Sequence, residues 1–109
     1  MTIDRSRPSY RLEDLRVAID NQRCVFTKSA REGRAALGFT EEDGNECLKS
    51  LSRSEFAKSA PDRAGRKGLF HDQYATCWDG HHIFVKFFRV SDDQPFIVSS
   101  FKTDTDYDV

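Results

Sequence analysis

Residues 69–90 read LFHDQYATCWDGHHIFVKFFRV. Aromatic and β-branched residues on both sides of Asp79-Gly80 are typical of strands, and an Asp-Gly pair favours a β-hairpin because the tight turn needs positive φ. We therefore predict strands at Leu69–Cys77 and His81–Val90. A second turn at residues 91–94 leads to a third predicted strand at Pro95–Thr103, which completes an antiparallel meander.

The hairpin register divides the side chains between two faces of the sheet, because residues directly opposite each other share a face. One face mixes polar, charged and aromatic residues: His71, Gln73, His82, Phe84, Lys86 and Phe88. The other face is more uniformly apolar: Phe70, Tyr74, Ile83, Val85 and Phe87. We expect the apolar face to pack on helices and the mixed face to carry the function.

The third strand has two possible registers. A five-residue loop at 91–95 pairs Phe84 with Lys102 and puts Ile97 and Phe101 on the apolar face, whereas a four-residue loop turns Lys102 inward. Burying a large apolar side chain is worth about 1.5–3 kcal/mol, so we predict the five-residue loop. The mixed face then gathers four polar residues around two rings: His71, Lys86, Ser100 and Lys102 around Phe84 and Phe88.

The first half of the chain has the apolar spacing and the capping residues of helices. The predicted elements are a helix from Leu12 to about Asn21, a brief strand or buried connector at 24–26, a helix capped by Thr27 or Ser29 that ends at Gly38, and a helix from Thr40 to about Leu51. Residues 52–68 read as an irregular, basic loop. This order predicts an α+β fold, with N-terminal helices packed on a twisted antiparallel β-sheet.

Length and composition indicate one globular domain over residues 1–109, with a loose lead-in at 1–9 and a frayed acidic tail at 104–109. No apolar run approaches the roughly 20 residues of a membrane span, so we expect a cytoplasmic protein. Three widely spaced cysteines, Cys24, Cys47 and Cys77, predict reduced and mostly buried thiols rather than a disulfide framework.

The net charge of −1 is unevenly distributed. Residues 1–68 hold fourteen Lys and Arg against eleven Asp and Glu, whereas residues 69–109 hold three against seven. A nucleic acid would therefore have to bind through a local cationic patch rather than through overall charge. Aromatic rings beside lysines on the mixed face are suited to single-stranded nucleic acid, which stacks its bases and presents phosphates.

A series of short motifs, in order and with their spacing, resembles the MqsR toxins of bacterial type II toxin–antitoxin systems. The motifs are Tyr10-Arg11-Leu12 with Leu15, Thr27-Lys28-Ser29-Ala30 before Leu37-Gly38, residues 51–59 (LSRSEFAKS), Asp72-Gln73-Tyr74, Ile83-Phe84-Val85-Lys86 and Ser100-Phe101-Lys102. The resemblance spans about residues 10–103. It implies a RelE-like fold, an mRNA interferase that arrests growth, and an MqsA-like antitoxin partner with a zinc-containing N-terminal domain and a DNA-binding C-terminal domain.

The catalytic positions of this family correspond here to Lys58, His71, Phe84 and Lys102. Lys58 and Lys102 match the family pattern, whereas His71 replaces Gln and Phe84 replaces Tyr. Phe84 has no hydroxyl to donate but can still stack on a base. His71 adds a group with an ordinary pKa near 6.5, which suits acid or base catalysis at neutral pH.

The resemblance implies metal-independent cleavage, in which the ribose 2′-hydroxyl attacks the adjacent phosphate. We expect Lys58 and Lys102 to hold that phosphate, His71 to move a proton and Phe84 to stack a base. The remaining predicted RNA-binding residues are Arg63, Arg66, Lys67, Lys86 and Phe88. No cofactor is expected, and Cys77, Asp79, His81 and His82 around the hairpin turn match no standard zinc spacing.

Two alternatives remain open at this point. The same face is also suited to a non-catalytic module that holds RNA or a protein without cutting. The second alternative is a degenerate toxin that only binds its antitoxin, because two of the four family positions are substituted.

Overall fold

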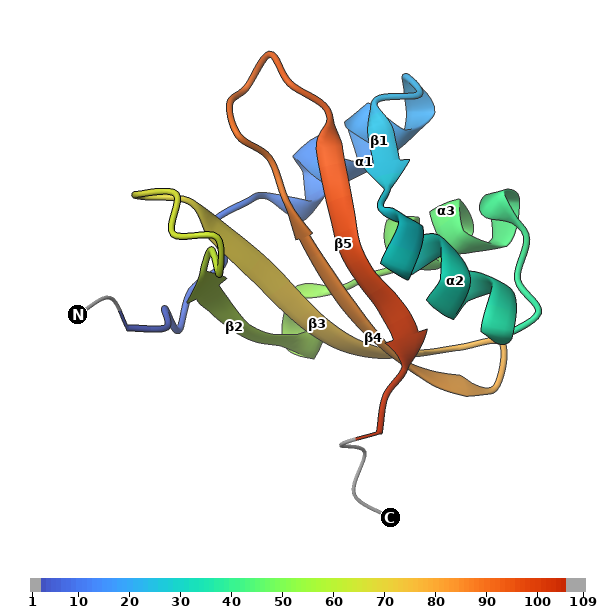
Figure 1. Cartoon of the computed structure of the whole chain (residues 1–109). Coiled ribbons are helices and arrows are strands. Elements are labelled where there is room, and N and C mark those ends of the chain that lie inside the picture. Colours follow the sequence, from blue (N-terminus) through green and yellow to red (C-terminus); the bar gives the residue numbers. More distant parts are fainter. Residues whose placement is uncertain (1–2, 106–109) are drawn as a thin grey trace.

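A five-stranded sheet with three helices on one side forms the fold over residues 3–105, the part of the chain that the computed structural model describes (Figure 1). The elements are α1 (Leu12–Asp20), β1 (Cys24–Phe26), α2 (Lys28–Ala36), α3 (Glu41–Lys49), a 3₁₀ turn η1 (Arg53–Glu55), β2 (Phe56–Pro61), β3 (Phe70–Trp78), β4 (His81–Phe88) and β5 (Phe96–Thr103). The predicted α+β class is confirmed. Most of the expected acidic tail, residues 106–109, lies outside the described residues.

The sheet order is β1-β5-β4-β3-β2, with β1 parallel to β5 and the other neighbours antiparallel. The short segment at 24–26 is therefore a strand, which makes the sheet mixed rather than purely antiparallel. No helix of the described residues has both the length and the apolar character that crossing a membrane requires.

The helices begin where the capping residues predict. The hydroxyl of Thr27 accepts a hydrogen bond from the amide of Ala30 at 3.2 Å, so Thr27 rather than Ser29 caps α2. At α3, Thr40 and Asp43 exchange side-chain-to-amide bonds of 3.1 and 2.9 Å, forming a capping box. Helix α2 lies close on β5 because Gly33 has no side chain; a Cβ there would stand 2.0 Å from the carbonyl oxygen of Phe101.

The apolar face of the meander packs on the helices, as predicted. Tyr74, Ile83, Val85 and Phe87 are fully buried, and they form one core cluster with Leu15 of α1 and with buried residues of α3. The pairing of β3 with β4 also agrees with the sequence, with Ala75 opposite Phe84 and Gln73 opposite Lys86.

The register of β5 is partly as predicted. Phe84 pairs with Lys102, which confirms the five-residue register at that end of the strand. A β-bulge then intervenes, because Lys86 pairs with Ser100 but Phe87 pairs with Val98. The extra residue, Ser99, changes the alternation of side chains before it.

As a result of the bulge, the prediction for Ile97 is wrong. Phe96 and Val98 point into the core with 0% exposure, whereas Ile97 is half-buried and pairs with Phe88 on the mixed face. The bulge also puts two consecutive serines, Ser99 and Ser100, on that face. Pattern reasoning cannot find such an insertion, because it assumes strict alternation along the strand.

Residues 56–61 are not the irregular segment that the sequence suggests. They form edge strand β2, which pairs with β3 from Phe56 opposite Tyr74 to Pro61 opposite Phe70. The strand has little β-branched character and ends at a proline, which is tolerated at the end of an edge strand. Pairing with a neighbour, rather than local propensity, makes this segment a strand.

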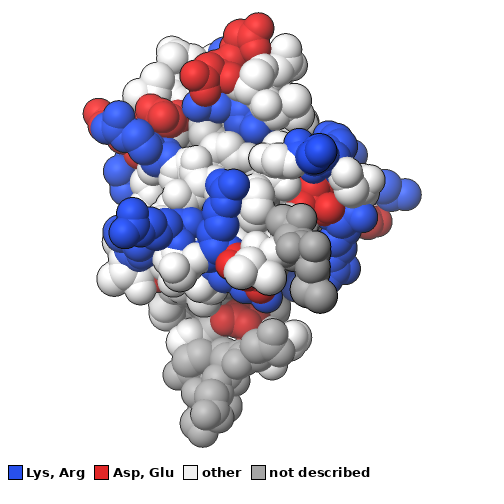
Figure 2. All heavy atoms as spheres, turned by 90° about the vertical axis from the view of Figure 1, so that its left-hand side faces the viewer, with Lys and Arg blue, Asp and Glu red and all other residues white. Residues whose placement is uncertain are grey.

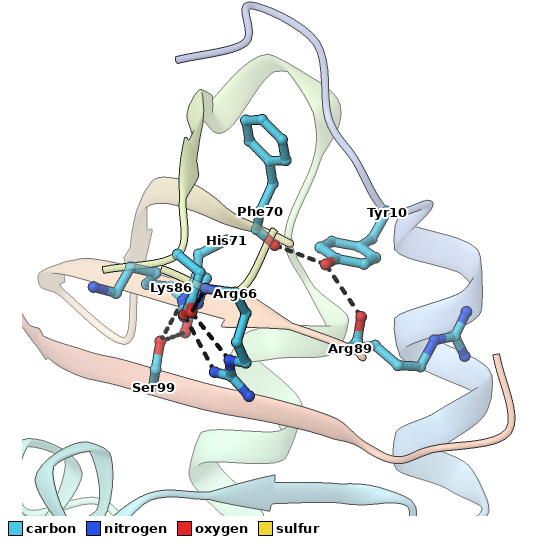
Figure 3. Close-up of polar contacts among 8 residues, drawn as sticks. Tyr10, Arg66, Phe70, His71, Lys86, Arg89 and Ser99 are labelled. Atoms are coloured by element: carbon cyan, nitrogen blue, oxygen red, sulfur yellow. Dashed lines mark hydrogen bonds and ion pairs between the residues drawn. The ribbon is translucent and has the colours of Figure 1, made fainter. Parts of the chain in front are cut away.

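The N-terminal segment, expected to be a loose lead-in, lies against this edge. Arg5 and Ser59 exchange two backbone hydrogen bonds of 2.7 and 3.0 Å. The buried carboxylate of Asp72 accepts bonds of 2.9 Å from the amides of Ser9 and Tyr10. The Tyr10 hydroxyl contacts the carbonyl oxygens of Phe70 and Arg89 at 2.7 and 3.2 Å, where β3 begins and β4 has ended (Figure 3).

Candidate functional site

The mixed face of the sheet presents a row of polar side chains across four strands. Lys58 of β2 pairs with Gln73 of β3, Gln73 pairs with Lys86 of β4, and Lys86 pairs with Ser100 of β5. Paired residues share a face, so all four side chains project from the same side. Strands lie about 4.8 Å apart, which puts the backbones of Lys58 and Lys86 roughly 10 Å from each other, with Gln73 between them.

A depression of about 300 Å³ lies over this row. Its lining residues come from the N-terminal segment, β2, β3, β4 and the loop that follows β2: Asp4, Lys58, Ala60, Pro61, Asp62, Arg63, His71, Gln73 and Lys86. Lys and Arg side chains are spread over the side of the molecule shown in Figure 2, with a few carboxylates between them. Three cations, Lys58, Arg63 and Lys86, line the depression together with two carboxylates, Asp4 and Asp62. The cations suit an anionic ligand.

The next row along the strands holds a partly exposed aromatic ring. The ring of Phe84 is half-buried, and the Lys102 Nζ lies 5.7 Å from its centroid. Phe84 pairs with Lys102 on one side and with Ala75 on the other, so the small side chain of Ala75 leaves room beside the ring. This row is two residues, roughly 7 Å, from the row of Lys58 and Lys86.

His71 occupies the opposite flank of the central row. Its Nε2 lies 2.8 Å from a carboxylate oxygen of Asp62, and its Nδ1 lies 3.3 Å from the Ser99 hydroxyl (Figure 3). The imidazole also stacks on Phe88, with 4.2 Å between ring centroids. Both nitrogens and one face of the ring therefore contact the protein, and only 12% of the side chain is exposed.

These contacts shift the pKa of His71 in opposing directions. Burial lowers its pKa, with Lys86 and Arg66 acting in the same direction, although the hydrogen bond to Asp62 opposes the shift. In the neutral ring, Nε2–H donates to the Asp62 carboxylate, because a carboxylate can only accept. The single hydroxyl proton of Ser99 can then be donated either to the Nδ1 lone pair at 3.3 Å or to the carbonyl oxygen of Lys86 at 3.4 Å.

Asp62 holds the basic loop at 62–68 on the sheet. Arg66 donates to its two carboxylate oxygens through Nε at 3.0 Å and Nη2 at 3.2 Å, and the Arg66 amide adds a third bond at 3.1 Å. These bonds, with Arg66 first and His71 contributing, hold the pKa of the Asp62 carboxyl well below its usual range. The guanidinium of Arg66 lies 5.1 Å from the Phe88 ring, so the loop also covers that ring.

Asp62 and Ser99 were both missed by the sequence analysis. The four-residue spacing of Asp62 and Arg66 is a signal for Asp62, since side chains at that separation can meet in a turn. Ser99 has no comparable signal, because only the bulge turns it toward His71. Together these two residues decide what the imidazole contacts.

The four family positions share one face but do not surround one point. Lys102 pairs with Phe84, which pairs in turn with Ala75 on β3. Ala75 is four residues, roughly 13 Å, from His71 along the same strand. His71 and Lys102 therefore lie on opposite flanks of the central row, and the expectation that they share one phosphate pocket is not met. Lys58 and Lys86 lie between the two flanks.

The other predicted RNA-binding residues fall into two groups. Arg63 borders the depression and is exposed, and Lys67 is exposed in the same loop. Arg66 is bound to Asp62, and Phe88 is only 6% exposed beneath the His71 ring. Phe88 is therefore a buried support for His71, and the prediction that it is an exposed ring is wrong.

Lys58 carries an ion pair of its own. Its Nζ lies 3.1 Å from the Asp4 carboxylate, and both side chains are about half exposed. The backbone pairing of Arg5 with Ser59 brings Asp4 to this place, since Asp4 and Lys58 are the neighbours of the paired residues. A carboxylate of the chain thus lies where Lys58 would hold a phosphate.

The residues around the hairpin turn have other contacts. The ring of Phe39 lies edge-on to His81 at 5.3 Å and to Trp78 at 5.2 Å. Within residues 3–105, no group of three or more His, Cys, Asp or Glu residues is placed to hold a metal ion. All three cysteines are free, with Cys47 buried, Cys24 half-buried and Cys77 exposed, so the prediction of mostly buried thiols is wrong for Cys77.

Comparison with known proteins adds one finding to this geometry. The sequence model of a family described as "Motility quorum-sensing regulator, toxin of MqsA" matches residues 7–103, nearly the whole of the described chain. A search of curated proteins found no match.

Proposed function

Because the chain belongs to the MqsR toxin family, we propose that it is a metal-independent, sequence-specific endoribonuclease that cleaves mRNA and so inhibits translation and growth. The family assignment makes the protein a toxin of a toxin–antitoxin system with an antitoxin partner, for which the family description names MqsA. The nuclease activity, its substrate and its residues are the proposal. An mRNA substrate places this activity in the cytoplasm.

The observation that carries the proposal is the alignment of Lys58, Gln73 and Lys86 across three strands, with Phe84 in the adjacent row. Two ammonium groups on either side of a neutral amide form a site for one phosphate. A ring roughly 7 Å away can stack a base of the same strand. This combination of cations and a partly exposed ring is suited to binding single-stranded RNA.

The proposed reaction needs no group that the chain lacks. The 2′-hydroxyl attacks the adjacent phosphorus, negative charge grows on the phosphoryl oxygens, and the 5′-oxygen leaves. Cations placed where that charge develops lower the barrier. Lys58 supports the phosphate from β2, Lys102 neutralises charge beside the base stacked on Phe84, and Arg63 and Lys67 hold flanking phosphates from the loop. Arg66 contributes indirectly, by holding that loop in place.

His71 remains a candidate for proton transfer, with one condition that its contacts impose. Its Nε2 faces Asp62 and its Nδ1 faces Ser99, so a substrate would have to replace the longer of the two bonds, the 3.3 Å contact with Ser99. Apo-state hydrogen bonds are often rearranged when substrate binds. In that arrangement Asp62 orients the imidazole and stabilises its protonated form.

The decisive experiment incubates purified protein with a defined single-stranded RNA and maps the cleaved ends. We expect a 2′,3′-cyclic phosphate on one product, a 5′-hydroxyl on the other, and the same cleavage rate in EDTA. Lys58→Ala and Lys102→Ala should each slow cleavage and relieve growth arrest while the protein remains folded. Loss of cleavage on chelation would contradict the metal-independent mechanism.

A second candidate function is a non-catalytic module that binds RNA or only the antitoxin. Two observations favour it: Phe84 has no hydroxyl, and both nitrogens of His71 are bound within the protein. The same assay separates the two functions. RNA binding without products at high protein concentration supports a binding module, and tight antitoxin binding without RNA binding supports a degenerate toxin.

For the antitoxin we propose strand addition at an edge of the sheet. The edge strand β2 already pairs with Arg5 at Ser59, which limits access to that part of its backbone. The strand at the other edge, β1, exposes 49% of Val25. Operator DNA would be bound through the antitoxin, as the resemblance implies.

A further inference from the structure

Lys86 occupies the centre of the candidate site. It pairs with Gln73 on one side and Ser100 on the other, and it lies between the row of Phe84 and the flank that carries His71. Lys86 interacts electrostatically with residues of three other segments: Arg63 and Asp62 of the loop, Lys102 of β5, and His71 of β3. Lys58 lies across Gln73 on β2. A phosphate bound over Gln73 would therefore lie between Lys58 of β2 and Lys86 of β4, and Lys86 would be its nearest contact on β4.

The other candidate groups of the site are held by contacts within the protein that Lys86 does not make. Lys58 is paired with Asp4 at 3.1 Å, Lys102 lies over the Phe84 ring, and His71 is bound through both nitrogens. Lys86 forms no ion pair with any carboxylate of residues 3–105. Its ammonium group extends away from the His71–Ser99 contact in Figure 3, and its side chain lines the depression.

We propose that Lys86 is the catalytic general acid of the site, the residue that protonates the leaving 5′-oxygen of RNA. This inference rests on the proposed ribonuclease function and assigns a chemical role to a residue that was expected only to hold flanking phosphates. Lys86 lines the depression, pairs with Gln73 across the sheet and lies within electrostatic range of Arg63 and Lys102, and this placement supports the role.

The surroundings of Lys86 make proton release easier. Burial of the half-exposed side chain lowers its pKa, and Arg63 and Lys102 lower it further, while Asp62 acts in the opposite direction. A lower pKa gives a stronger acid, which improves proton transfer to a poor leaving group.

The step balances without a further reagent. The 2′-oxygen forms a bond to phosphorus as its proton passes to water, and the bond from phosphorus to the 5′-oxygen breaks. The Lys86 ammonium gives one proton to that oxygen, so the products are a 2′,3′-cyclic phosphate and a 5′-hydroxyl. The neutral amine then takes a proton from water, which restores the starting state.

The test uses the full chain with Lys86→Arg, because arginine keeps the positive charge but does not release a proton in proteins. Removing a general acid costs roughly 10²–10⁴-fold in rate. We expect cleavage by Lys86→Arg to fall at least about 10²-fold, while its RNA affinity stays within about threefold of wild type. Lys28→Arg, on the exposed first turn of α2, is the matched control and should leave both quantities unchanged.

A second substrate makes the readout specific for proton transfer. This substrate is RNA with a bridging sulfur in place of the 5′-oxygen. Its leaving group departs as a thiolate, which needs no general acid. We expect Lys86→Arg to cleave it at nearly the wild-type rate, whereas a variant that has lost its fold would cleave neither substrate. Thermal unfolding of Lys86→Arg provides the independent check of the fold.

The outcomes separate this inference from the function on which it rests. Wild-type protein that cuts neither substrate refutes the ribonuclease and the acid together. Wild-type cleavage with an equally fast Lys86→Arg variant refutes only the role of Lys86. A slow variant that the sulfur substrate does not rescue assigns Lys86 to charge stabilisation and also overturns the proposal.

Discussion

The Nε2 of His71 lies 2.8 Å from the carboxylate of Asp62, and this contact joins strand β3 to the loop at 62–68. It connects the stability of the candidate site to its chemistry. The carboxylate is also held by Arg66, so the loop, the imidazole and the buried Phe88 ring form one unit on the flank of the site. Four predictions follow from this unit and from the neighbouring rows.

Stability should decrease at mildly acidic pH because of His71. Burial lowers its pKa in the folded protein, so the unfolded chain binds the proton more readily near the ordinary pKa of about 6.5. The free energy of unfolding is then fully retained above that pH and falls as the pH drops from about 6.5 toward the lower pKa of the folded state. Urea unfolding between pH 5 and 8 measures this slope.

The control for that measurement replaces the imidazole. His71→Gln should flatten the pH dependence in this window, because glutamine does not titrate. His81→Gln, at an exposed position of the hairpin turn, should retain the wild-type slope. A wild-type stability that rises on acidification would show that the bond to Asp62 outweighs burial and that His71 is protonated in the fold.

Removal of Asp62 should release the basic loop. Asp62→Ala leaves Arg66 and the Nε2 of His71 without their partner, and a lost buried hydrogen-bonding partner costs about 1–3 kcal/mol. We expect a lower free energy of unfolding and faster proteolysis at the basic residues of 62–68. Glu32→Ala, at an exposed position of α2, should change neither quantity. An unchanged rate and pattern of proteolysis in Asp62→Ala would contradict the proposal that Asp62 anchors the loop.

Restoring the phenol at position 84 should raise the cleavage rate. Phe84→Tyr keeps the ring beside Lys102 and adds a hydroxyl that can donate to the substrate phosphate. A well-placed donor is worth up to about 10²–10³-fold in rate, so an increase of about 10-fold is expected for one that is not perfectly aligned. Phe84→Leu is the matched variant and should weaken RNA binding, because a base–ring stack contributes about 1–3 kcal/mol. Equal RNA affinity in Phe84→Leu and wild type would remove the stacking role.

Asp4 should compete with RNA for Lys58. The pair is exposed, so its own contribution is small, at about 0.2–1 kcal/mol. Asp4→Asn is expected to tighten RNA binding by a few-fold at low salt, since Lys58 is released and a repulsive charge is removed. Lys58→Ala should weaken binding and reduce the slope of log affinity against log salt by about 0.7. Titrations of a single-stranded RNA at several salt concentrations measure both effects, and an unchanged salt slope in Lys58→Ala would exclude a phosphate contact.

Much of the sheet followed from the sequence because its signals are local. The Asp79-Gly80 turn sets the register of the first hairpin, and alternation then assigns each side chain to a face. The core residues Tyr74, Val85 and Phe87 were identified in this way, and so was the pairing of Phe84 with Lys102. Helix starts at Thr27 and Thr40 were likewise predictable, because capping uses residues three positions apart.

Contacts between distant segments decided the rest. Residues 56–61 become a strand because β3 offers them a partner. The N-terminal segment is held in place because Asp72 and Ser59 bind its backbone and the Tyr10 hydroxyl binds two carbonyl oxygens of the sheet strands and their ends. One inserted residue at Ser99 changes which side chains of β5 enter the core, and no local pattern announces it. The extent of burial of His71, which lowers its pKa, depends on how the preceding loop folds back over the sheet and on a bulge 28 residues away in sequence.

The sequence by itself therefore determined the fold class, the family and the face on which the four family positions lie, since periodicity and turn chemistry act within a few residues. Only the tertiary structure decided how that face is organised: Lys86 at the centre, Lys58 paired with Asp4, and His71 held between Asp62 and Ser99. Those relations depend on strand order, a bulge and burial, all of which arise when segments distant along the chain pack together.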